Sequence, residues 1–211
     1  MSDSGGGWHV DYYFSPSSPW TYLGHDRFAG IAGRHGAEIA VKPVDYGVIF
    51  PQSGGLPLGK RAPQRQAYRL MELKRWKEHL GVPLNVQPKF FPVDGNPAAL
   101  AIVAAAPSGA DAQMRLAGAI LRALWAEEKN IADPATLRAA AAKAGLDGEK
   151  LIAAAPDAKA QYDAFTQEAL ARGVFGAPTY AYRDELFCAS SPAISPRDFG
   201  TNGFSLWTWG R

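Results

Sequence analysis

Hydrophobic positions at the start of the chain repeat first with the period of a strand and then with that of a helix. Residues 8–14 are aromatic or β-branched with loose alternation, which predicts a strand. Ser18 and Pro19 follow as a preferred N-cap and a preferred first helical residue, and apolar side chains then recur at helical spacing as far as Gly36. Residues 38–44 predict a second strand. Strand, helix and strand within about 35 residues favour a parallel pair with a right-handed crossover.

Helical spacing dominates the middle of the chain. Residues 45–60 are rich in Gly and Pro and are expected to form a loop. Further helices are expected to begin at Asn96-Pro97 and Asp133-Pro134, each a cap residue followed by a first-turn proline, and the last one runs from about Asp157 to Arg172. Before these, the first helix of the region is expected to begin at Pro63, because apolar residues then recur at helical spacing: Tyr68, Met71, Leu73, Trp76 and Leu80.

The strand pattern returns near the C-terminal end of the chain. Residues 174–182 predict a strand, Arg183-Asp184-Glu185 a polar turn, and residues 186–188 the second strand of a hairpin. Residues 189–211 contain repeated Pro and Gly without a period and are expected to be irregular. The predicted domains of this α/β chain are a strand-containing domain, residues 8–60 and 174–211, and a helical insertion, residues 61–173.

Composition limits the classes of function. The chain has 211 residues, 47% of them hydrophobic, so it can bury a core. Its 22 basic and 20 acidic side chains leave a net charge of +2, which predicts no nucleic-acid partner. The absence of an apolar run of about 18 residues and of a signal-peptide pattern predicts no membrane span and a cytoplasmic location. One cysteine excludes an internal disulfide and a redox pair, and four scattered histidines predict no metal site.

The junction between the first strand and the first helix carries the candidate chemistry. It reads Ser17-Ser18-Pro19-Trp20-Thr21-Tyr22. A helix N-terminus stabilises a thiolate or another anion placed there, and the Ser18 hydroxyl can donate a hydrogen bond to it. The alternative is that Ser18 only caps the helix. Far along the chain, Gly176-Ala177-Pro178-Thr179 precedes a strand, where Pro178 can equally be an ordinary trans proline.

Taken together, these two motifs and the order of elements resemble the thioredoxin-like fold of the DsbA type. The C-x-x-C position of that fold is occupied here by Ser18-Pro19-Trp20-Thr21, so disulfide exchange through it is chemically unavailable. Within the superfamily the chain resembles the 2-hydroxychromene-2-carboxylate isomerases, which are related to kappa-class glutathione transferases. The matching residues are Phe14, Ser18 to Gly24, Ser53 to Leu58, Arg65, Tyr68, Glu72-Leu73, Arg75-Trp76, Gly81 to Leu84, Pro88 to Pro92, Gly173 to Thr179 and Asp184 to Phe187.

The resemblance implies glutathione as cofactor and an aromatic carboxylate as substrate. It implies a cis Pro178 that faces the helix N-terminus, with Ser18 hydrogen-bonded to the glutathione sulfur. Glutathione would be held by the backbone beside Ala177 and Pro178, by Gly55 and by Arg65. Each aromatic or cationic candidate can equally be a core side chain or a solvated charge. The implied substrate-binding residues are Trp20, Tyr22, Lys89, Phe90 and Phe91, with Trp125 and Arg61 as further candidates.

The chain departs from the family pattern at two places. Many relatives carry Asn where this chain has Gly55, which offers only its backbone. After Phe187 the family continues with W-G-x-D-R into a C-terminal helix, whereas this chain continues with Cys188-Ala189-Ser190. We therefore expect the C-terminal helix to be atypical or missing. A reading-frame change near codon 188 is one hypothesis for this difference.

Three functions follow from these residues. The first is glutathione-dependent cis-trans isomerisation of 2-hydroxychromene-2-carboxylate to trans-o-hydroxybenzylidenepyruvate in aromatic catabolism. The second is a kappa-like glutathione transferase that uses the same thiolate on an electrophile. The third is a catalytically weak glutathione-binding or interaction protein with an altered C-terminus. Family members are commonly dimers, so the resemblance also raises the expectation of a homodimer.

Overall fold

A four-stranded mixed sheet forms the centre of the molecule. The computed structural model describes residues 8–188. Strands β1 (His9–Phe14) and β2 (Glu38–Pro43) are parallel, whereas β3 (Thr179–Tyr182) is antiparallel to β1 and β4 (Glu185–Cys188) is antiparallel to β3. The strand order is β2-β1-β3-β4. The sequence therefore predicted correctly both the parallel β-α-β unit and the C-terminal hairpin.

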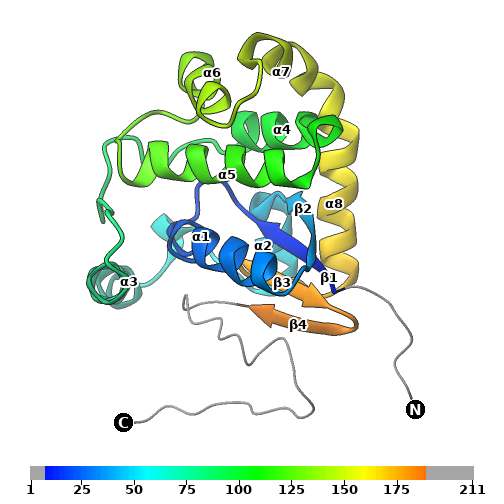
Figure 1. Cartoon of the computed structure of the whole chain (residues 1–211). Coiled ribbons are helices and arrows are strands. Elements are labelled where there is room, and N and C mark those ends of the chain that lie inside the picture. The colour runs from blue at the N-terminus through cyan, green and yellow to red at the C-terminus, as the bar shows by residue number, and fades with distance from the viewer. Residues whose placement is uncertain (1–7, 189–211) are drawn as a thin grey trace.

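Helices cover both faces of this sheet and build a layer beside it (Figure 1). Helix α1 contacts α5 and α3, whereas α8 contacts β2 and α2. Figure 1 shows α4 to α7 stacked on one side of the sheet and α8 running back toward it. None of the helices in the described part of the chain is long and apolar enough to cross a membrane. The helices are α1 (Pro19–Arg34), α2 (Tyr46–Ser53), α3 (Pro63–Leu80), α4 (Asn96–Ala104), α5 (Ala110–Trp125), α6 (Pro134–Lys143), α7 (Gly148–Ala154) and α8 (Lys159–Ala171), with short 3-10 turns at Leu58–Lys60, Ala106–Ser108 and Ala155–Ala158.

Alternation along β1 produces a separate core on each face of the sheet. Tyr12 and Phe14 pack with α1 and the helical layer, and Tyr12 stacks on Tyr180 of β3 with 5.2 Å between ring centroids. Tyr13 points the other way and packs with residues of α2 and α8. Successive strand side chains face opposite sides of a sheet. All four rings are fully buried, which is why this strand contains so little polar sequence.

A charged network joins α8 to the sheet. Lys42 on β2 lies 2.7 Å from Asp11 on β1 and 2.7 Å from Glu168 on α8, and Arg172 also pairs with Asp11. The Tyr13 hydroxyl donates to Glu168 at 2.8 Å. Burial raises the pKa of Asp11, but the hydrogen bonds and charges of Lys42 and Arg172 outweigh it and leave that pKa lowered. The network thus fixes the helix that leads into the loop before β3.

Three local expectations were wrong. The loop expected over residues 45–60 contains α2, because Asp45 caps it by accepting from the Gly47 amide at 2.7 Å and Gly54 ends it at φ 74°. Pro51 inside this helix disguises it in the sequence. The N-cap of α4 is Gly95 and not Asn96. The strand expected from residue 174 begins only at Thr179.

The apolar face of α3 also differs from the one that the sequence suggested. Tyr68 and Met71 are 49% and 47% exposed, whereas Arg69 and Leu73 are buried. The inward face is therefore built on Arg69, Leu73 and Trp76, spaced three or four residues apart. The domain division at residues 60 and 173 stays a prediction, and the expected irregular tail and missing C-terminal helix lie outside the described residues.

Candidate active site at the start of helix α1

Ser18 caps α1 directly after β1. Its backbone is extended at φ −81° and ψ 126°, and its Oγ accepts a hydrogen bond from the Thr21 amide at 3.2 Å. Pro19 is the first helical residue, where its missing N–H costs no helical hydrogen bond. The sequence predicted this cap correctly. Capping does not exclude a second role, because a hydroxyl can accept one hydrogen bond and donate another.

The loop before β3 lies against this cap. The Ala177–Pro178 peptide bond is cis, as the family resemblance implied. The Ser18 Oγ donates to the Ala177 carbonyl at 3.4 Å, across 159 residues of sequence. The β1–β3 register explains the meeting, because Tyr13 is paired with Thr179, so the loop after β1 and the loop before β3 lie at the same end of this strand pair. The structure thus brings together Ser18, Ala177 and Pro178.

The carbonyl of Gly176 positions this loop. It accepts one hydrogen bond from the Tyr46 hydroxyl at 2.6 Å and another from the Thr179 hydroxyl at 2.6 Å. Tyr46 comes from α2, the helix hidden in the sequence by glycine and proline. The sequence offered no direct signal for it, and it adds a positioning residue behind Pro178.

The geometry suits the stabilisation of a small anion. The N-terminal turn of α1 carries a partial positive charge, and the Ser18 hydroxyl can turn from the Ala177 carbonyl toward an incoming anion. Thr21, at the second cysteine position of the C-x-x-C motif, is fully buried, and its Oγ1 has no hydrogen-bond partner among residues 8–188. Neither Ser18 nor Thr21 can form a disulfide, and neither position supplies a sulfur nucleophile of its own.

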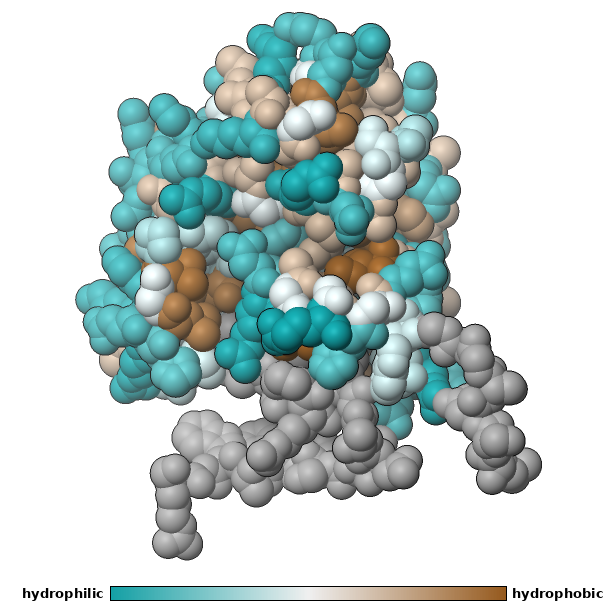
Figure 2. Space-filling view, in the orientation of Figure 1, coloured by the Kyte–Doolittle hydropathy of each residue, from teal (hydrophilic) through white to brown (hydrophobic). Residues whose placement is uncertain are grey.

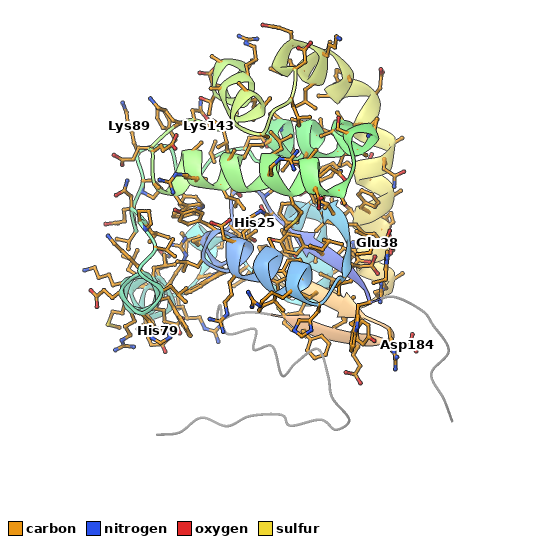
Figure 3. All side chains as sticks on the ribbon, in the orientation of Figure 1. His25, Glu38, His79, Lys89, Lys143 and Asp184 are labelled. Carbon is orange, nitrogen blue, oxygen red and sulfur yellow. The ribbon has the colours of Figure 1, made fainter. Side chains whose placement is uncertain are left out.

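The expected substrate-binding side chains are in different surroundings. Trp20, Phe90 and Phe91 are half-buried against the main core. Tyr22 is buried and its hydroxyl donates to the Pro83 carbonyl at 2.6 Å, which gives it a structural task. Lys89 is exposed, and Figure 3 shows its side chain pointing away from α1 into solvent. Their role in substrate binding stays a prediction, for which Lys89 is the least suited in this geometry.

A groove elsewhere does not include the cap. It has a volume of about 550 Å³ and lies where β2 passes beneath α5, at the apolar surface visible in Figure 2. Its walls come from β2, α4, α5 and α8 and the connecting segments, and neither Ser18 nor Pro178 lines it. Among the described residues, no cluster of three or more His, Cys, Asp or Glu side chains is arranged to hold a metal ion.

Comparison with known proteins agrees with this geometry. The family model of the DSBA-like thioredoxin domain matches residues 9–199. A 2-hydroxychromene-2-carboxylate isomerase of Pseudomonas putida is 30% identical over 184 residues, which cover 84% of this chain and 87% of that protein. The chain belongs to the 2-hydroxychromene-2-carboxylate isomerase family within the DsbA-like thioredoxin fold.

Two further relatives support this assignment. A solved structure of a 2-hydroxychromene-2-carboxylate isomerase superposes with a TM-score of 0.72 at 26% identity, covering 85% of this chain and 88% of that one. Glutathione S-transferase kappa 1 of Homo sapiens is 26% identical, covering 83% of this chain and 81% of that protein. The relatives of this chain thus include isomerases and a glutathione transferase, all of them enzymes.

Gly55 lies close to the ring of Phe50. A Cβ atom at Gly55 would lie 2.3 Å from Cδ1 of the Phe50 ring. An Asn here, which the family resemblance would lead one to expect, would therefore collide with Phe50 unless that ring moved. Arg65, the other side chain expected to bind glutathione, is exposed near the start of α3. Both residues stay candidates, with Gly55 limited to its backbone.

The sequence reasoning missed Arg69 altogether. This residue is only 8% exposed, and its guanidinium carbon lies 5.1 Å from the centroid of the Phe91 ring. Burial, together with the nearby charge of Arg61, lowers its pKa to about 10. An arginine in a helix rich in Lys and Arg looks like a solvated charge. Its spacing of four residues before Leu73 was the signal that placed it on the buried face.

Proposed function

We propose that this protein is a glutathione-dependent cis-trans isomerase that acts on 2-hydroxychromene-2-carboxylate or on an aromatic carboxylate of the same kind. The observation that carries the proposal is the Ser18 hydroxyl at the start of α1, in hydrogen-bond contact with the carbonyl beside cis Pro178. The relatives named as isomerases give the reaction class. Glutathione fits here because the chain supplies a hydroxyl donor and a helix N-terminus, but no cysteine at either position of the C-x-x-C motif.

The residues at the site would have different roles in this reaction. When bound, glutathione would supply a thiolate that adds to a conjugated carbon, converts a double bond into a rotatable single bond and leaves after rotation. Ser18 and the first turn of α1 lower the energy of that thiolate by hydrogen bonding and by the helix field. Tyr46 and Thr179 hold the Pro178 loop, whose backbone would pair with the glutathione peptide as an added strand.

A kappa-like glutathione transferase is the second candidate, favoured by the similarity to the human kappa enzyme. Isomerisation returns glutathione unchanged, whereas conjugation consumes it. Following the thiol concentration alongside substrate absorbance therefore separates the two. The third candidate, a weak glutathione-binding protein, rests on the altered sequence after Phe187 and predicts binding without turnover of either kind.

Substitution of Ser18 tests the proposal. Ser18→Ala should raise the pKa of the bound glutathione thiol, seen in its ultraviolet absorbance, and lower kcat by about 100-fold, as for loss of one donor to a reacting anion. Because it also removes a helix cap, Asp133→Ala is the matched control, since it removes the cap of the distant α6. Ser18→Asp keeps a capping oxygen but places a carboxylate beside the thiolate, and it should be as inactive as Ser18→Ala. An active Ser18→Asp enzyme with an unchanged thiol pKa would refute the proposed role.

A further inference from the structure

Arg69 is an arginine in an apolar setting. It is 8% exposed on the inward face of α3, one turn before the fully buried Leu73. Its guanidinium carbon lies 5.1 Å from the ring centroid of Phe91 and 5.8 Å from that of Trp125. Phe91 and Trp125 also contact each other, with 4.9 Å between centroids. The guanidinium is thus held by the faces of two aromatic rings, which attract a cation but accept few hydrogen bonds.

Two hydrogen-bond donors in this cluster lack acceptors. The Arg69 Nη2 and the Trp125 Nε1 are both shielded from solvent, and neither has a hydrogen-bond partner among residues 8–188. Buried donors are nearly always paired in native proteins, and an unpaired charged donor is especially costly. The two unpaired donors belong to side chains whose guanidinium carbon and ring centroid lie 5.8 Å apart, so together they mark a place where one acceptor would be stabilised.

The charge around the cluster selects an anion. Arg61 lies near enough to contribute to the lowered pKa of Arg69. The two acidic residues that follow Trp125 in the chain have other partners, because Glu127 pairs with Lys143 and Arg122, and Glu128 accepts from the Lys89 amide. The planar fork of a guanidinium matches the two oxygens of a carboxylate.

The cluster is connected to the Ser18 turn by the segment between α3 and α4. The Asn85 amide donates to the Trp125 carbonyl at 2.7 Å. The same segment passes Phe91 and reaches Gly95, where a Cβ atom would lie 3.5 Å from the Ser17 Oγ. Four residues of extended chain span at most about 14 Å. The ring that covers Arg69 is therefore attached to the same end of the molecule as Ser18.

We propose that Arg69 and the indole N–H of Trp125 form a carboxylate-binding site, which receives the carboxylate of the aromatic substrate or that of the glycyl end of glutathione. The first source rests on the proposed function, and the second only on glutathione binding. Because both donors are closed to solvent, the ligand enters by displacing the half-buried Phe91 ring. Arg69 is then a specificity-determining residue for carboxylate ligands, and the exposed Lys89 is not needed for this task.

Binding measurements on the whole chain test this site. The probes are salicylate, its neutral amide, glutathione and glutathione esterified at the glycyl carboxyl group. Arg69→Met keeps a side chain that fills the space between the rings, and Arg75→Met is the matched control because Arg75 is an exposed arginine of the same helix. By calorimetry, Arg69→Met should weaken salicylate at least tenfold, and Arg75→Met should leave it unchanged. The amide should bind weakly to every variant.

A weakened affinity for glutathione but not for salicylate, with the ester insensitive to Arg69→Met, would assign the site to glutathione. The Trp125 indole N–H resonance, identified with Trp125→Phe, should move downfield when the bound carboxylate arrives. Without ligand, Arg69→Met should be as stable as the parent or more stable, because it removes an unpaired buried charge. The site would be overturned if Arg69→Met were less stable than the parent but bound salicylate and glutathione with unchanged affinity. It would also be overturned if the Trp125 indole N–H chemical shift did not change at saturating ligand. Neither result would change the dependence of the glutathione thiol pKa on Ser18, so the proposed function is tested separately.

Discussion

The carbonyl of Gly176 offers a quantitative test of how the Pro178 loop is held. It accepts hydrogen bonds from Tyr46 and from Thr179, both at 2.6 Å. Either Tyr46→Phe or Thr179→Val removes one donor and leaves the carbonyl with the other. Each single change should therefore cost only about 1 kcal/mol of unfolding free energy, the net value of one hydrogen bond.

The double variant should cost more than the sum of the single changes. With both hydroxyls removed, a half-buried carbonyl loses the two donors that it has among residues 8–188, and part of its hydration is not restored. Because Gly176 is only half-buried, the additional cost is at the low end of the range for an unsatisfied group, about 1 kcal/mol. The total is then about 3 kcal/mol, or a fall of roughly 6–12 °C in Tm for a chain of this size.

Urea unfolding at constant m-value measures these free energies. The matched control pairs Thr179→Val with Tyr22→Phe, because Tyr22 is a buried tyrosine that also donates to a backbone carbonyl at 2.6 Å, that of Pro83. This second pair shares no acceptor and should be additive within about 0.5 kcal/mol. If the non-additive part of the unfolding free energy were the same for Tyr46→Phe with Thr179→Val as for Tyr22→Phe with Thr179→Val, the idea that Tyr46 and Thr179 act on one shared carbonyl would be refuted. Glutathione affinity should fall in the Gly176 pair and stay unchanged in Tyr22→Phe.

Three further changes have defined outcomes. Asp11→Asn should cost about 2 kcal/mol of unfolding free energy at neutral pH, because it leaves Lys42 with one carboxylate fewer. Folding lowers the pKa of Asp11, so its contribution to stability is present above the ordinary carboxyl pKa and is lost as pH falls through the folded value. In denaturant titrations at several pH values, the unfolding free energy of the variant should therefore fall less steeply in acid than that of the parent. Burial lowers the pKa of His25, which Figure 3 shows between α1 and α5, so the unfolding free energy should fall once pH drops below about 6.5. His25→Gln should make this dependence of unfolding free energy on pH less steep, and an unchanged dependence would show that another group titrates. Gly55→Asn should cost about 1–3 kcal/mol of unfolding free energy, because the new side chain collides with Phe50. Adding Phe50→Ala should recover stability and, by calorimetry, improve the affinity for glutathione. A Gly55→Asn variant as stable as the parent would contradict the collision.

The sequence was most informative where one short segment decides the structure. Ser18 and Pro19 start a helix because cap and first-turn preferences act on adjacent residues. The motif around Pro178 and the family resemblance led to the thioredoxin-like fold and to a cis proline opposite Ser18, and both agree with the structure. Local rules failed at α2, where Gly47 and Pro51 concealed a helix that a good cap and packing against α8 maintain.

The sequence by itself therefore determined the order of elements, the cap at Ser18 and the loss of disulfide chemistry, because each depends on residue identity and near neighbours. Only the tertiary structure decided which side chains lie together across the chain. It placed Tyr46 behind the Pro178 loop and turned Arg69 inward between Phe91 and Trp125. Helical spacing alone favoured Tyr68 and Met71 for the inward face, since burying a charge is costly in isolation. Two aromatic rings from distant segments offset that cost, and no pattern within α3 could reveal them.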